Sequence, residues 1–354
     1  MLLESANITP TINSNLSEDE QVTWRDRWLQ SANAIYGIFM NIIAVPFDIF
    51  QRYAGAQRMA YLFLLPNLLI FGTFTLLPVL LNVYYSFTGG SNPFIQDRPL
   101  VGIENYRHLF DCKSYFDPSS CREDIFWSSI PRTIIYVISS VVFTLLFSLI
   151  TALTLNRSIY GKGFYRSVFF YPVMLSPVVV AFTWRWIVRR EGVLNAMLTG
   201  LGLDPINFMV NPWWATFWVI FLGVWASMGF YTLIILAGLQ GIPPELYEAA
   251  KMDGATDLRS FLHVTFPLLS PTMLVVLVLV VIRSVQVFDH VYAFTTGGPG
   301  TATKYLVQYI VETGFTTYPR NFGLAAAASV LMLIALGVIT LIQLSLSRKT
   351  DDIY

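Results

Sequence analysis

Long apolar segments separated by short polar ones fill the chain from about residue 60 onward. A helix of about 20 residues crosses a hydrocarbon layer of roughly 30 Å, and six of these segments reach that length. The predicted spans are residues 60–87, 133–155, 166–185, 214–239, 272–293 and 324–346. We therefore expect an all-α integral membrane protein with six transmembrane helices, in a membrane domain over residues 59–347.

Prolines and tryptophans refine two of these spans. The third contains Pro172 and Pro177, and a proline removes a backbone donor and clashes with the preceding turn. We expect a kink there, unless neighbouring helices satisfy the freed carbonyl groups. At the fourth span, Trp213, Trp214 and Trp218 are typical of an aromatic belt at a membrane surface.

The chain before the first span is less regular. Residues 1–23 are polar and lack the basic start and apolar centre of a signal peptide, so we expect a disordered cytoplasmic tail. Residues 24–58 are more apolar, but Asn41, Pro46 and Asp48 interrupt them. This pattern favours an amphipathic helix lying in the membrane interface, and an extra span is the alternative.

Composition agrees with a membrane protein. Hydrophobic residues make up 55% of the chain and charged residues only 12%, whereas soluble domains carry about 25% charged residues. The formal net charge is zero. That balance argues against a nucleic-acid partner held by a basic surface and leaves membrane lipid as the expected surroundings.

The placement of basic residues orients the chain. The short loop after the second span holds Arg157, Lys162 and Arg166 without an acidic residue, so the positive-inside rule places it in the cytoplasm. Counting spans then puts the loop 240–270 and both termini in the cytoplasm, and the loop 88–130 outside. Basic residues also occur in the outer loops, so the rule by itself gives only a modest preference.

Cys112 and Cys121 are the only cysteines, and both fall in the outer loop. Two thiols make a poor metal site, and their short spacing suits a small disulfide-closed loop on an oxidising side of the membrane. Two unrelated free thiols are the alternative interpretation.

The long polar interruption over residues 241–267 predicts two short helices. Pro243 and Pro244 suit a helix start, and acidic residues in the first turn favour the positive end of the helix dipole. Gly254 tolerates the left-handed conformation that ends a helix. Thr256 or Asp257 can cap the second helix, and Pro267 marks its exit. One side of the first helix, spaced as in a helix, consists of Leu246, Ala249, Ala250 and Asp253.

The sequence Glu248-Ala249-Ala250, followed by Gly254 and by Val264-Thr265-Phe266-Pro267, resembles the motif of permease subunits of binding-protein-dependent ABC importers. The resemblance implies the type I ABC importer permease fold, with this stretch as a cytoplasmic coupling helix in a cleft of the ATP-binding subunit. It covers the second to sixth spans well and the first loosely. The residues assigned to that contact are Glu245, Glu248, Ala249, Ala250, Asp253, Gly254 and Pro267.

The same resemblance implies partners and a location. The expected partners are a second homologous permease subunit, two ATP-binding subunits that carry ATP and Mg, and an extracytoplasmic solute-binding protein. The expected location is the plasma (inner) membrane of a prokaryote. The chain has no P-loop, since Gly161-Lys162-Gly163 lacks the first glycine and the trailing hydroxyl. We therefore expect no cofactor and no enzymatic chemistry in this chain.

A second stretch points to the substrate class. Phe288-Asp289, Tyr292, Thr295 and Gly297-Gly298-Pro299 resemble a pattern of the sugar-importing branch of this family, which implies a carbohydrate or related small solute. Gly-Gly-Pro also ends a helix by itself, so helix termination is the alternative role.

Polar and aromatic residues near the later spans are candidates for the substrate path. Arg283 lies about halfway along the predicted fifth span, where a charge costs at least ~2.5–3.5 kcal/mol on insertion scales. It should face a watery path or a subunit interface, or else serve structure. The full candidate set is Arg283, Gln286, Asp289, Tyr292, Trp225 and Tyr231.

Two other classes of protein compete with this interpretation. An ion- or proton-coupled secondary transporter predicts a buried acid or histidine relay, and few acidic residues fall in the predicted spans. A membrane-embedded enzyme predicts a metal or nucleophile motif near an interface, and the sequence contains neither H-E-x-x-H nor G-x-S-x-G.

Overall fold

The computed structural model describes residues 27–34, 36–37 and 56–351. The predicted tail lies outside the described residues, and so does most of the predicted interfacial helix, of which residues 27–34, 36–37 and 56–58 are described and helical. The chain divides into two compact units, Met1–Val79 and Leu80–Tyr354.

The first described span crosses the boundary between the units. It consists of α2 (Ala56–Phe71), a wide π-turn over Gly72–Leu76 and α3 (Leu77–Ser86). The helix Phe63–Ser86 within it is long and apolar enough to cross a membrane. The π-turn lets the helix continue with one widened hydrogen-bonded ring.

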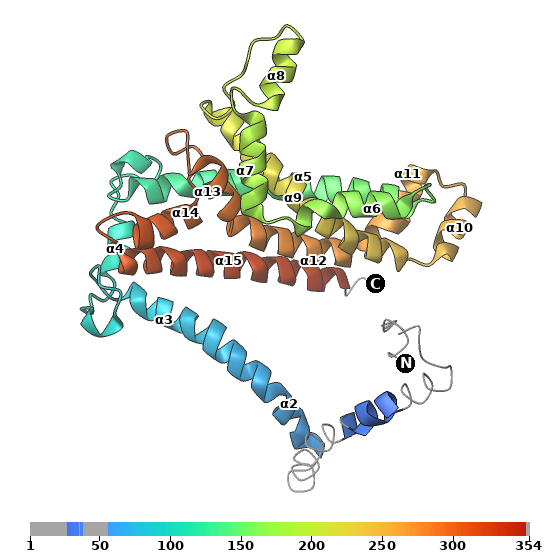
Figure 1. Ribbon diagram of the computed structural model, residues 1–354, viewed down its shortest axis with the longest axis horizontal. Helices are drawn as coiled ribbons and strands as arrows, with labels where there is room; N and C mark the ends of the chain where they lie inside the picture. Colours follow the sequence, from blue (N-terminus) through green and yellow to red (C-terminus); the bar gives the residue numbers. More distant parts are fainter. Residues whose placement is uncertain (1–26, 35, 38–55, 352–354) are drawn as a thin grey trace, which may run out of the picture. The chain divides into compact units, whose positions relative to one another are not determined.

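The second unit is a bundle of helices joined by short turns (Figure 1). Its helices in chain order are α4 (Glu104–Leu109), α5 (Asp124–Asn156), α6 (Lys162–Phe170), α7 (Pro177–Val188), α8 (Val193–Gly200), α9 (Pro212–Gln240), α10 (Pro244–Met252), α11 (Asp257–Ser260), α12 (Phe266–Val285), α13 (Asp289–Thr295), α14 (Leu306–Val311) and α15 (Phe322–Asp351). Short 3-10 turns cover Ile95–Asp97, Pro118–Ser120 and Tyr171–Met174, and π-turns cover Phe261–Thr265 and Glu312–Thr316.

Among the described residues, five helices are long and apolar enough to cross a membrane, and a bent pair of helices adds a sixth if the pair is one span. That pair, Lys162–Met174 and Pro177–Gly200, bends by 99°. Pro172 lies in the turn before the bend, and Pro177 opens α7. The predicted kink is thus a sharp break, because both prolines lack the N–H that would continue the helix.

Small side chains let α5 pack along α9. Ser140, Thr144, Ser148 and Ala152 follow each other at four-residue spacing on α5, and all are buried. Small residues allow helix backbones to approach closely. The Ser148 hydroxyl donates to the carbonyl oxygen of Met228 on α9, 3.0 Å away. This polar contact satisfies a hydroxyl that would otherwise be buried alone.

Aromatic side chains fill the other end of the same helix pair. Trp218, predicted as part of a surface belt, is only 8% exposed, whereas Trp213 is 85% exposed. Trp218 packs against Trp184 of α7, with ring centroids 5.6 Å apart. Trp218 therefore belongs to the core, because side chains of neighbouring helices such as α7 cover it.

Two predicted span boundaries were wrong. The helix of the second span begins at Asp124 rather than at Thr133, so the loop before it ends at Glu123 and not at the predicted residue 130. An acidic residue suits the first turn. The Arg132 guanidinium, taken as the polar boundary, lies inside the helix and bonds to the Ser128 hydroxyl at 3.2 Å.

The helix of the fifth span begins and ends earlier in the chain than predicted. One helix runs from Asp257 to Val285 and so passes through Pro267 and Pro271. The expectation that Pro267 ends the second short helix is therefore wrong. The π-turn directly before Pro267 widens the helix, and such a turn is one way that a helix continues past a disrupted hydrogen bond.

Candidate functional site

Helices α10 and α11 form a hairpin at one end of the bundle, and α4 and α14 lie at the other end (Figure 1). The α10 helix begins at Pro244, as predicted, with Glu245 in its first turn and Lys251 in its last. Both charges are placed favourably for the helix dipole. The start of this helix could be predicted because the residues that determine it are close together in the sequence.

Gly254 ends α10 in the left-handed conformation, with φ of +72°. The amide of Gly254 donates to the carbonyl of Lys251 at 3.0 Å, and the amide of Ala255 donates to that of Ala250 at 2.9 Å. These two bonds are the Schellman pattern, which satisfies the last carbonyls of a helix. A Cβ at Gly254 would have no atom within 4 Å, so this position faces open space.

The α10–α11 hairpin turns one face outward and anchors the other. Glu245, Glu248 and Ala249 are exposed, and Ala250 is half-buried. Met252, on the same hairpin, is 88% exposed. An exposed mixture of carboxylates, alanines and large apolar side chains suits a protein partner better than bulk water.

The second helix of the hairpin continues into the fifth span. Its N-cap is Thr256, whose hydroxyl accepts from the Arg259 amide at 3.4 Å, as one of the two predicted caps. Leu258 is 68% exposed and Leu262 is 50% exposed. The apolar surface of the hairpin therefore extends from α10 onto α11.

The predicted substrate-path residues on the fifth span lie near its end. Arg283 is in the last turn of α12, not halfway along the span, because the helix ends at Val285. Gln286 follows directly, and Asp289 and Tyr292 lie on α13. Arg283, Gln286, Asp289 and Tyr292 are all exposed within this chain.

Two other candidates pack inside the bundle. Tyr231 is 4% exposed and belongs to a core cluster with Ala152 and Leu236. Trp225 is half-buried, and its ring lies 5.7 Å from that of Trp184. In this conformation both side chains pack against neighbouring helices. Most of the surface of each side chain is therefore covered by protein and does not face an open path.

A groove of about 370 Å³ lies between α7 and α13. Arg185 and Phe182 line it from α7. Asp289 and Tyr292 line it from α13, together with Phe288, the residue directly before α13. Arg185 marks only the end of the third predicted span in the sequence, and no sequence pattern connects it with Asp289. An arginine so close to an apolar span is the sequence feature that could have marked it as a candidate site residue.

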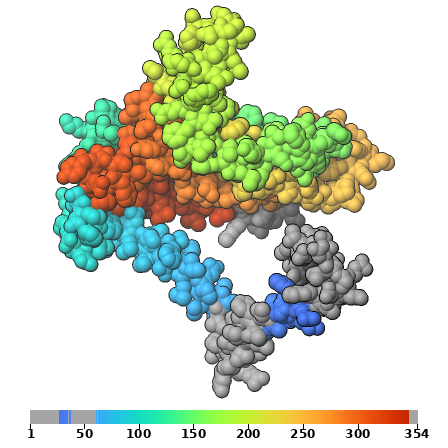
Figure 2. Space-filling model, viewed as in Figure 1, coloured from blue at the N-terminus to red at the C-terminus, as the bar shows by residue number. Residues whose placement is uncertain are grey.

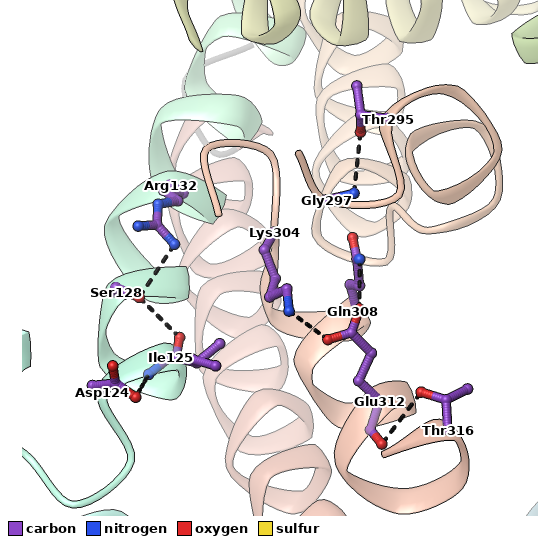
Figure 3. Close-up of polar contacts among 10 residues, drawn as sticks. All are labelled: Asp124, Ile125, Ser128, Arg132, Thr295, Gly297, Lys304, Gln308, Glu312 and Thr316. Carbon is purple, nitrogen blue, oxygen red and sulfur yellow. Dashed lines mark hydrogen bonds and ion pairs between the residues drawn. The ribbon is translucent and has the colours of Figure 1, made fainter. Parts of the chain in front are cut away.

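Polar contacts brace the loop after α13 (Figure 3). The Lys304 ammonium lies 2.6 Å from one carboxylate oxygen of Glu312, and the Gln308 amide donates to the other at 2.8 Å. Gln308 is 1% exposed, and its amide lies beside Gly297. A Cβ at Gly297 would lie 2.6 Å from Gln308 Nε2, and φ there is +87°.

The loop before α5 is closed by a disulfide between Cys112 and Cys121. Beside it, the Tyr309 hydroxyl of α14 donates to the Glu123 carboxylate at 2.9 Å. Burial and the nearby Glu123 carboxylate raise the pKa of Tyr309, so this hydroxyl stays protonated and able to donate. Phe116, near the tip, is fully exposed.

These features define a multi-pass membrane protein that presents a helical hairpin at one end. The described part of the chain holds no group of three His, Cys, Asp or Glu side chains able to bind a metal ion. Residues 128–351 match the family of binding-protein-dependent transport system inner membrane components, and the chain belongs to that family. The resemblance carried by the Glu-Ala-Ala motif is confirmed.

Relatives of known description are permease subunits rather than enzymes. The chain is 34% identical over 297 residues to the trehalose/maltose transport system permease protein MalF of Thermococcus litoralis, covering 83% of this chain and 95% of that protein. It is 33% identical over 298 residues to the sulfoquinovosyl glycerol transport system permease protein SmoG of Agrobacterium fabrum, covering 84% and 92%.

A solved structure shares the fold. A chain of the bacterial alginate ABC transporter, in complex with an alginate pentasaccharide-bound periplasmic protein, superposes with a TM-score of 0.69 at 25% identity. The match covers 84% of this chain and 97% of the transporter chain. The all-helical permease architecture is therefore shared along nearly the whole of that chain.

Proposed function

We propose that this protein is the permease subunit of an ATP-driven importer for a carbohydrate or related small solute. A second permease subunit, two ATP-binding subunits and an extracytoplasmic solute-binding protein complete the transporter. The exposed α10–α11 hairpin carries the proposal, because its charged and apolar surface has no partner within the described chain and its sequence matches the coupling motif. The sugar class is supported by the relatives, which belong to trehalose/maltose and sulfoquinovosyl glycerol transport systems.

The hairpin transmits movement to the span that holds the candidate path residues. Glu248 is exposed and makes a charge-assisted contact with the ATP-binding subunit. The helix Asp257–Val285 has 29 residues, which gives a rod of about 43 Å. One end of this rod is α11 and the other carries Arg283. Closure of the ATP-binding subunits on α10 therefore tilts the rod and opens the path alternately to the two sides.

The proposed topology has six spans, counting the bent pair α6–α7 as one. Both termini are cytoplasmic, residues 24–58 form an interfacial helix, and the loop with Cys112 and Cys121 lies outside. The membrane is the plasma (inner) membrane of a prokaryote. The basic loop at Arg157, Lys162 and Arg166 supports this orientation.

The substrate passes the exposed side chains at the end of the fifth span. Arg283 and Gln286 offer hydrogen-bond donors, and Asp289 offers an acceptor. Tyr292 offers a ring and a hydroxyl. Trp225 and Tyr231 support the helices from inside the bundle in the conformation described here, and a role in the path requires a rearrangement of their packing.

Reconstitution tests the proposed function directly. The chain is expressed together with the subunits encoded by its neighbouring reading frames. The resulting four-subunit transporter is placed in proteoliposomes with its solute-binding protein. We expect uptake of at least one of radiolabelled maltose, trehalose and lactose that requires both ATP and the binding protein. Uptake that persists without ATP and stops when an ionophore removes the ion gradients would support a secondary transporter instead. Failure of all three sugars would contradict the carbohydrate class.

A further inference from the structure

The groove between α7 and α13 lies beyond the end of the fifth span, away from the α10–α11 hairpin. Figure 1 shows α7 and α13 side by side, and in the space-filling view α7 and α8 rise from the surface of the second unit (Figure 2). In the proposed orientation this is the side from which a binding protein delivers its solute. A molecule that moves inward along the fifth span passes the groove before it reaches Gln286 and Arg283.

The groove combines aromatic rings with two polar side chains. The rings of Phe288 and Tyr292 stack with centroids 5.2 Å apart and an angle of 23°, and Phe182 faces them from α7. A pyranose ring presents an apolar C–H face and a rim of hydroxyl groups. An aromatic wall suits the face, and a carboxylate acceptor and a guanidinium donor suit the rim.

Arg185 and Asp289 keep their hydrogen-bonding capacity for a ligand. Both line the groove, yet the ion pairs of the described residues are His108–Glu123 and Lys304–Glu312. Their opposite charges cancel across the groove, so it favours a neutral ligand over an anionic one. A carboxylate can accept from two adjacent hydroxyls, and a guanidinium has five donors.

The wall formed by α13 is held rigidly. The Tyr136 hydroxyl of α5 and Nε2 of His290 lie 3.2 Å apart and share a hydrogen bond. Val291 is 1% exposed and Phe294 is fully buried, which fixes the opposite side of α13 in the core. A site with fixed walls loses little freedom when a ligand binds.

From these contacts we propose that the α7–α13 groove is a subsite for a neutral sugar ring, formed by Phe288, Asp289 and Tyr292 on one side and Arg185 on the other. The inference rests on the proposed function as a carbohydrate importer. It adds that the sugar first binds at this groove, outside the centre of the membrane. The occupant to which it commits is the sugar, not a side chain of the second permease.

A cysteine placed in the groove reports its occupancy. Because Cys112 and Cys121 are bonded to each other, a Tyr292→Cys variant has one free thiol. The complete transporter is trapped facing outward with its binding protein and a non-hydrolysable ATP analogue, and a membrane-impermeant maleimide labels it. The sugar added is the one of maltose, trehalose and lactose that the wild type imports fastest. We expect this sugar to slow labelling of the thiol about tenfold. Labelling of a Glu191→Cys variant, on the exposed turn after α7, should be unaffected by the sugar.

Transport by an Asp289→Asn variant gives the second measurement. The loss of one charged hydrogen-bond partner should lower sugar uptake about tenfold or more, while ATP hydrolysis stimulated by the binding protein stays near the wild-type rate. Glu191→Gln is the matched control and should import normally.

Several outcomes would overturn the subsite. Labelling at position 292 that ignores the sugar, or normal uptake by Asp289→Asn, contradicts it. A thiol at position 292 that reacts in the isolated chain but never in the assembled transporter identifies the groove as a subunit contact. A parallel loss of ATP hydrolysis and uptake identifies a structural role. If the wild-type transporter imports none of the sugars, the proposed function fails instead.

Discussion

Tyr247 and Thr265 join the α10–α11 hairpin to the foot of the fifth span through a hydrogen bond between their hydroxyl oxygens, 3.1 Å apart. Tyr247 is half-buried against the core cluster around Leu239 and Leu269, and Thr265 is 5% exposed. The hairpin therefore cannot move far without disturbing the helix that carries Arg283.

The Tyr247→Phe variant should weaken this link. Removal of the hydroxyl leaves the buried Thr265 hydroxyl without this partner, at a cost of about 1 kcal/mol. We expect sugar imported per ATP hydrolysed to fall several-fold, with little change in the amount of protein in the membrane. Thr265→Val and the double variant complete a double-mutant cycle. Additive losses in the cycle would show that the two hydroxyls act independently.

Gly254→Asp should abolish ATP-dependent uptake while the chain remains inserted in the membrane. A Cβ at position 254 has no atom within 4 Å of it, and Asp tolerates the left-handed conformation better than most residues. The loss should therefore come from a charge at the docking surface. Uptake in proteoliposomes, together with co-purification of the ATP-binding subunit, measures the effect.

Gly254→Asn is the matched control for that variant. Asn has nearly the same size and conformational tolerance as Asp but carries no charge. We expect it to retain more uptake than Gly254→Asp. Equal and complete loss in both variants would point to the size of the side chain, and unchanged uptake in Gly254→Asp would remove the coupling role.

The Cys112–Cys121 bond should resist alkylation. Mass spectrometry of the protein purified without reductant should find neither cysteine alkylated until a reductant is added. The loop between the two residues closes with a sequence separation of 9. In the chain-entropy model, such a bond stabilises the folded loop by about 2–3 kcal/mol, because it reduces the conformational entropy of the unfolded loop. A Cys112→Ser, Cys121→Ser double variant should therefore be cut faster by external protease near Phe116.

Loss of the Glu312 charge should loosen the loop after α13. In a Glu312→Gln variant the Lys304 ammonium, with its side chain 16% exposed, loses its ion-pair partner. We expect a destabilisation of about 1–3 kcal/mol, which is less than for a fully buried pair. A thermal unfolding scan in detergent measures it. Adding Lys304→Met should recover part of the loss, and no recovery would show that the ion pair itself is not responsible.

The sequence predicted those features that depend on a few neighbouring residues. Hydropathy located six apolar segments, because a span needs only a long enough apolar run. The left-handed helix end at Gly254 and the cap at Thr256, one of the two predicted caps, follow from turn chemistry within one helical turn. The motif around Glu248 then pointed to the permease family, which the match over residues 128–351 confirms.

The limits of the fifth span could not be predicted in this way. Pro267 and Pro271 are strong local stop signals, yet the helix runs through both. Packing of the buried Leu269 and Val276 against neighbouring spans stabilises the helix across them. Tertiary contacts of this kind routinely override local propensity.

The sequence by itself determined the class of protein, the number of apolar segments and the hairpin that the motif marks, since each is written in residues close together in the chain. Only the tertiary structure decided that Tyr231 is buried, that Arg283 lies at a helix end, and that Arg185 and Asp289 line one groove. These relationships join residues from different helices, and helix packing alone sets the distances between them.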